Sequence, residues 1–185
     1  MASESLQDLL VNAPNKKELK ELYHEINTGT DRSTVIVTSI FVENSLRDAI
    51  VARMHKLTKA EYDQLFTGNG SLSTFSNKIR LGYALGVFGS QVRNNLDLIR
   101  RIRNAFAHAR RPISFRRQQI MSMANNLSHA AIWKSGGLKN APPSEQAKGV
   151  YSLTCMFLYV SFQVGAKRDR RRKMRKPGVR ALEND

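Results

Sequence analysis

The side chains best suited to chemistry stand close together near the middle of this 185-residue chain. Arg103, Asn104 and His108 form an Arg-x-x-x-x-His string with a polar residue after the arginine. A guanidinium can stabilise developing negative charge, and an imidazole can move a proton near neutral pH. Positions five apart on a straight helix point roughly 140° apart. These candidate catalytic side chains therefore converge only if the helix ends or bends near His108, or if a second subunit completes the site.

Arg103 also has a purely structural interpretation. At helical spacing it falls on the same stripe as the apolar residues Ile99 and Phe106, where a charge needs a partner. Glu43 flanks the apolar face of an earlier predicted helix and is a suitable inward carboxylate. In this alternative, Glu43 and Arg103 form a buried ion pair that fixes helix register. His108 is then a polar residue near a helix end, where the dipole favours a cation.

Arginine clusters on both sides of His108 suggest an anion-binding or nucleic-acid-binding surface. The candidates are Arg100, Arg101, Arg110, Arg111, Arg116 and Arg117. Two arginines at the start of a predicted helix oppose its dipole unless an anion binds nearby. The alternative is ordinary surface charge on a basic protein.

A second basic run follows the last apolar stretch and includes Arg168, Arg170, Arg171, Arg172 and Lys173. It has no aromatic residue for base stacking and no DNA-reading motif around it. Each phosphate contact would add non-specific, salt-sensitive affinity. The run predicts non-specific binding of RNA or DNA, with anionic lipid as another candidate. It equally fits a solvated terminus that serves solubility.

Apolar residues recur near the helical period, and no segment alternates as a strand does. We therefore expect an all-α fold, a single compact bundle-like domain with a basic C-terminal tail. The domain limits are 1–28 for an N-terminal helical segment, 29–166 for the helical domain and 167–185 for a flexible tail. The helices expected are 6–11, 16–26, 31–56, 62–66, 75–87, 91–111, 115–127 and one from 144 onward.

Composition narrows the class of protein. Thirty Lys and Arg against fifteen Asp and Glu leave a net charge of +15, which favours nucleic acid or an acidic protein as partner. The single cysteine, Cys155, excludes an internal disulfide, and the N-terminus lacks a signal-peptide pattern, so we expect a cytoplasmic protein. The apolar run 150–166 falls short of the ~20 residues of a membrane span. No metal or nucleotide motif is present, so we expect no metal and no cofactor.

Residues 65–87 carry a more specific pattern. The Gly-rich loop 67–71 leads into a helix with a basic residue, then Leu81-x-Tyr83 and Leu85-Gly86. This pattern resembles the mannitol operon repressor family, and the resemblance covers 31–127, more weakly 150–162. It implies a compact helical regulator, often self-associating, hence an expected homodimer. The family implies no known DNA-reading helix, so such a regulator would act through a protein partner.

The Arg103–His108 string is in turn similar to the motif of HEPN domains, many of which are metal-independent endoribonucleases. In such an enzyme, the histidine would handle the proton of the attacking 2′-hydroxyl or of the leaving oxygen. The arginine would stabilise charge on the phosphorane. Two functions thus stay open, a regulatory interaction protein, which we prefer, and a ribonuclease acting as a toxin or defence component.

The chain departs from the repressor family at Arg116 and Arg117, where relatives tend to be acidic.

Overall fold

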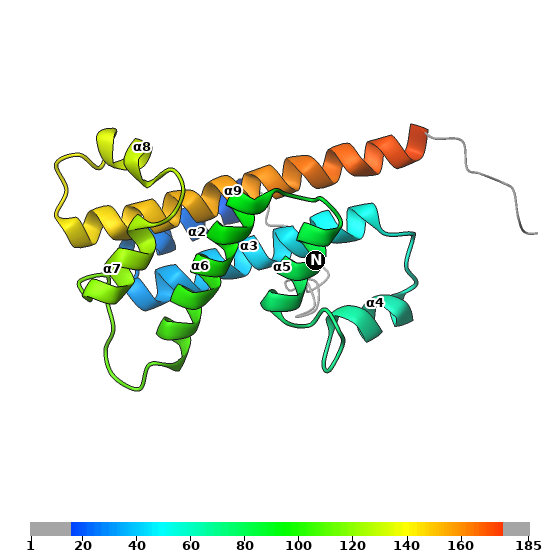
Figure 1. Cartoon of the computed structure of the whole chain (residues 1–185), viewed down its shortest axis with the longest axis horizontal. Helices are drawn as coiled ribbons and strands as arrows, with labels where there is room; N and C mark the ends of the chain where they lie inside the picture. Colours follow the sequence, from blue (N-terminus) through cyan, green and yellow to red (C-terminus); the bar gives the residue numbers. More distant parts are fainter. Residues whose placement is uncertain (1–15, 176–185) are drawn as a thin grey trace, which may run out of the picture.

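The computed structural model describes residues 16–175, which form helices and no strand over that part of the chain (Figure 1). The all-α prediction is therefore confirmed. The predicted helix 6–11 lies outside the described residues. In chain order the helices are α2 (Lys16–Thr28), α3 (Asp31–Arg53), α4 (Lys59–Phe66), α5 (Phe75–Ala84), α6 (Ser90–His108), α7 (Gln118–Asn125), α8 (Ala130–Ser135) and α9 (Pro143–Arg175).

Two long helices, α3 and α9, lie side by side at the centre of the bundle and run in the same direction (Figure 1). Ion pairs join them near both ends, Asp31 with Lys148 over 3.3 Å and Arg53 with Asp169 over 2.8 Å. Between these pairs the contact is mostly apolar. The fully buried side chains include Val35, Val42, Leu46, Ile50, Val150, Tyr151 and Leu158.

The shorter helices cover this central pair. Helices α2, α5 and α6 pack on α3, whereas α7 and α8 pack on α9. Helix α6 buries one apolar stripe at helical spacing, which ends at Phe106. The Phe106 ring lies 5.5 Å from that of Phe115, which lies 5.8 Å from the Tyr151 ring of α9. This row of aromatic rings holds the C-terminal end of α6 on the core.

Hydroxyl caps set several helix starts. Thr58 and Glu61 form a capping box, so α4 begins at Lys59, before the predicted start at 62, and Thr74 caps α5 through the amide of Asn77. Helix α5 ends at Ala84, before the predicted end at 87. Gly86 has a φ of 63°, and the amide of Val87 donates to the carbonyl of Gly82, as in a glycine-terminated helix end.

Three helix limits and the tail prediction need correction. The helix 31–56 ends at Arg53, and 91–111 spans Ser90–His108. The helix expected at 115–127 begins only at Gln118, because the amide of Phe115 donates to the Asp31 carboxylate over 2.9 Å. The prediction of a flexible tail from 167 was wrong for its first part. Helix α9 continues through Arg175, and Asp169 ties it to α3.

By length and apolar composition, α9 from Pro143 to Arg172 could cross a membrane. Its inner face packs along α3, with Leu158, Phe162 and Ala166 buried. Helices that form the core of a bundle pass the same test of length and composition. This packing makes α9 a helix of the bundle.

Candidate functional site

The structure brings Arg103 and Glu43 together. Arg103 Nη2 donates to Glu43 Oε2 over 3.0 Å, and Lys78 Nζ donates to the other carboxylate oxygen over 2.6 Å. Lys78 also donates to the carbonyl of Ser73 over 3.0 Å. The Glu43 and Lys78 side chains are 13% and 7% exposed, so both charges are largely withdrawn from water. One carboxylate thus connects α3, α5 and α6.

Lys78 was not singled out from the sequence. The signal for it was available, because Phe75, Lys78 and Gly82 fall on one helical stripe that faces the core. A lysine on such a stripe needs a buried anion, as Arg103 does. Two inward cations and one inward carboxylate would have predicted a shared site.

Asn104 and His108 have different surroundings from Arg103. Arg103 Nη1 donates to the Asn104 side-chain oxygen over 3.2 Å. Helix α6 continues to His108, its last residue, and the imidazole is exposed. Within residues 16–175, no hydrogen bond or ion pair joins Arg103 to His108. The single chain therefore does not assemble the three candidate catalytic side chains into one contact.

The solvent-facing side of α6 is polar and basic. At 100° per residue, Arg101, Asn104 and His108 share one face. Arg100 lies beside them, with its Nε 3.6 Å from Asp97 Oδ1. This face continues past the end of α6 into the loop before α7, where the exposed arginines are Arg110, Arg111, Arg116 and Arg117.

A shallow cavity of about 560 Å³ lies at the end of α6, between the loop 109–114 and the start of α3. Arg32 crosses it and donates to the carbonyls of Ala109 and Arg111 over 2.9 and 3.5 Å. Arg110 and Arg111 line the same cavity. Of the arginines predicted to bind anions, Arg110 and Arg111 therefore lie together at this end of the bundle, and those on α9 lie at the other end.

The second basic cluster is helical. Arg168, Arg170, Arg171 and Arg172 are exposed on the last turns of α9, whereas the side chain of Lys173 lies outside the described part. Figure 1 shows this end of α9 extending beyond the end of α3. The cations are therefore presented on an ordered helix anchored by Asp169.

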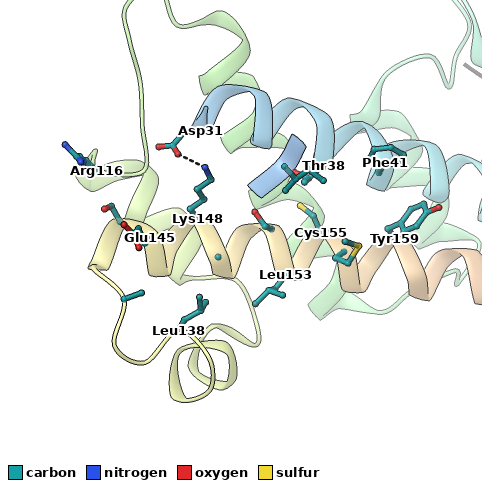
Figure 2. Close-up of a pocket in the computed structure, with 16 residues that line it drawn as sticks. Asp31, Thr38, Phe41, Arg116, Leu138, Glu145, Lys148, Leu153, Cys155 and Tyr159 are labelled. Carbon is teal, nitrogen blue, oxygen red and sulfur yellow. Dashed lines mark ion pairs between the residues drawn. The ribbon is translucent and has the colours of Figure 1, made fainter. Parts of the chain in front are cut away.

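A larger cavity of about 760 Å³ lies between α2, α3 and α9 (Figure 2). Apolar side chains, among them Phe41, Leu153 and Tyr159, line most of it, and the Asp31–Lys148 pair lies near one end. Cys155 also lines it, but burial raises the pKa of this thiol to about 12. The neutral thiol is no nucleophile at neutral pH. Among the described residues, no group of His, Cys, Asp and Glu has the arrangement of a metal site.

Helix α9 also carries an exposed apolar face that the sequence alone does not reveal. Its members are Leu153, Met156, Phe157, Val160 and Val164, each at least 40% exposed. The run 150–166 is largely apolar on every side of the helix. A helix that is apolar all round does not reveal which side lacks a partner, and only the packing shows this.

The sequence matches no protein-family model and no curated protein. Among solved structures, the chain is similar to MtlR in the X-ray structure of the MtlR-HPr complex from Escherichia coli, with a TM-score of 0.62 and 18% sequence identity. The match covers 78% of this chain and 97% of that chain. At this identity the likeness establishes the fold, and the fold is the helical one that the sequence resemblance implied.

Proposed function

We propose that this chain is a regulatory protein of the mannitol operon repressor kind, which acts by binding a partner protein. The observation that carries the proposal is the shared fold with MtlR, whose solved structure is a complex with HPr. HPr from the same organism is accordingly the first partner to test. A fold alone does not determine function, so the surface of this chain must also favour binding.

Two features of the chain support an interaction role over catalysis. Arg103 is engaged by Glu43 and Asn104, and His108 lies apart from it at the end of α6. A catalytic pair needs both groups at the reacting atoms. An exposed apolar face on α9 beside exposed arginines is, in contrast, typical of a protein-binding surface.

A metal-independent endoribonuclease is the second candidate, with Arg103, Asn104 and His108 as its catalytic residues. Its support is the exposed face shared by Asn104 and His108, which continues into Arg110 and Arg111. In this alternative, a second copy of the chain would complete the site, as the expected homodimer allows. The same arginines would hold RNA without reading its sequence.

One experiment separates the two functions. Purified protein is mixed with purified HPr and followed by sedimentation velocity. In parallel it is incubated with structured and unstructured RNA in EDTA. The proposal expects a faster-sedimenting complex with HPr and no RNA cleavage. The absence of any complex, together with cleavage that leaves 2′,3′-cyclic phosphate ends, would replace it with the ribonuclease.

A further inference from the structure

Helix α9 presents an apolar stripe to solvent, and two of its members, Leu153 and Met156, also line the larger cavity. Leu153, Phe157, Val160 and Val164 recur every three or four residues, and Met156 lies three residues after Leu153, so all five share one face of the helix. Their exposed fractions run from 40% to 62%. Single exposed apolar residues are ordinary on a protein surface, whereas a row of them over several helical turns marks a binding site.

Cations continue the same row of positions beyond Val164. At 100° per residue, Lys167, Arg168 and Arg171 fall on the face that carries the stripe. All three are exposed, and they follow the apolar residues toward the C-terminal end of α9. The outer face of α9 is therefore apolar over residues 153–164 and cationic over 167–171.

The stripe is held rigidly in place. On the opposite side of α9, Leu158 and Phe162 are buried against the bundle. Gln163 lies 3.5 Å from the Asp48 carboxylate, and Asp169 pairs with Arg53 over 2.8 Å. The side chains of the stripe are thus presented on a fixed helix. Binding a partner would therefore cost little conformational entropy of this chain.

We propose that the outer face of α9, from Leu153 to Arg171, binds a protein partner that presents an apolar patch continuous with a cluster of carboxylates. This inference rests on the proposed function, a regulator that binds a protein, and adds the surface and its complementary chemistry. The apolar residues fill the centre of the interface, and the arginines select an acidic partner at one edge. A helix with a leucine stripe and glutamates at one end is the simplest such partner.

The distribution of charge disfavours a membrane surface as the occupant. A helix that lies in a bilayer interface carries cations along the edges of its apolar face. Between Gly149 and Ala166, α9 has no charged residue, and the stripe is bordered by Ser152, Ser161 and Gln163. All the cations stand at one end.

A second copy of the chain is disfavoured on the same grounds. Two parallel copies of α9 would place their arginines against one another. Two antiparallel copies would place the arginines over the first turns of the partner helix, where Glu145 is accompanied by Lys148. Each chain carries a net charge of +15, so self-pairing adds repulsion that an acidic partner does not.

The test uses the full chain and a fluorescent synthetic helix of about 20 residues, with leucines on one face and glutamates at one end. A second peptide replaces each glutamate with lysine. Binding is measured by fluorescence anisotropy for the wild type and for Val160→Glu, Arg171→Glu and Ile40→Glu. Ile40 is the matched control, because it is 46% exposed on α3, against 51% for Val160. Circular dichroism checks that each variant folds.

The proposal expects the acidic peptide to bind and the lysine peptide to fail. Val160→Glu and Arg171→Glu each weaken binding on the order of tenfold, and Ile40→Glu leaves it unchanged. Equal binding by all variants would overturn the proposal. So would self-association of the wild type that Val160→Glu abolishes, or anionic-vesicle binding that Val160→Glu abolishes without peptide binding. If the peptides bind as expected but HPr does not bind, the surface on α9 stands and HPr is rejected as its partner. If HPr binds equally well to the wild type and to Val160→Glu, HPr stands as a partner and the surface on α9 is rejected.

Discussion

The carboxylate of Glu43 lies 3.0 Å from the guanidinium of Arg103, at a point where α6 would otherwise bury an apolar side chain against α3. The same carboxylate holds Lys78 of α5, so three helices meet at one charge. This arrangement explains why an arginine occupies an inward position on α6. It also means that the motif most suggestive of catalysis has a structural use in this chain.

Replacing Glu43 by Gln should destabilise the protein. The substitution leaves the Lys78 ammonium buried without its anion, and breaking a buried pair in this way costs about 3 kcal/mol of unfolding free energy. Urea unfolding measures the loss. Asp97→Asn serves as the control, because Asp97 and Arg100 are 42% and 30% exposed, against 13% and 7% for Glu43 and Lys78, and the loss of this pair should change stability by less than about 0.5 kcal/mol. Equal stability of the two variants would refute the role assigned to Glu43.

Gly70 in the Gly-rich loop should not tolerate a side chain. A Cβ at this position would lie 2.5 Å from the carbonyl oxygens of Gln64 and Leu65, which are backbone atoms that cannot move aside cheaply. We expect Gly70→Ala to lower the unfolding free energy by about 2 kcal/mol or more. Gly165→Ala in α9 meets no atom within 4 Å and should stabilise the helix by up to about 1 kcal/mol. In thermal unfolding, we expect Gly70→Ala to lower the Tm and Gly165→Ala to raise it.

The thiol of Cys155 should be inert in the folded protein. Burial penalises the thiolate and raises its pKa from 9.0 to about 12. At pH 8, a disulfide reagent should therefore label the native chain far more slowly than the chain in guanidinium. Because the folded pKa lies above the unfolded one, this group also lowers stability as the pH rises through 9. Rapid native labelling at pH 8 would show that the thiol is accessible.

His108→Ala should leave stability, HPr binding and RNA affinity unchanged, since the imidazole is exposed at the end of α6. Arg103→Ala should lower stability, because Arg103 is one of the two cations on Glu43.

Non-specific RNA binding should weaken when Arg110 and Arg111 are replaced by Ala, and the dependence of RNA affinity on salt concentration should fall with it. RNA cleavage in EDTA that both His108→Ala and Arg103→Ala abolish would instead identify a catalytic pair.

The sequence predicted the helical class and most helix starts because these depend on local signals. Apolar spacing placed α3, α6 and α9. The errors have tertiary causes. The Asp31 carboxylate accepts a hydrogen bond from the amide of Phe115, so α7 begins later than predicted. Arg53 forms an ion pair with Asp169, which keeps α9 helical into the basic run.

The candidate site was predicted less completely. Helical spacing placed Arg103 inward and suggested Glu43, but the third member, Lys78, and the exposed stripe of α9 depend on which faces meet in the folded chain. Residue spacing along one helix does not show which faces of different helices pack together. The separation of Arg103 from His108 followed from α6 remaining helical up to His108, which the sequence left open.

The most direct test of the proposed function is isothermal titration of HPr from the same organism into the wild-type chain. We expect saturable binding at one site per chain, weakened by Val160→Glu and preserved in His108→Ala. The contradicting result is the absence of any heat of binding over a range of temperatures, together with sedimentation of the chain and HPr as two separate species. That result would exclude a regulator that acts through this partner protein.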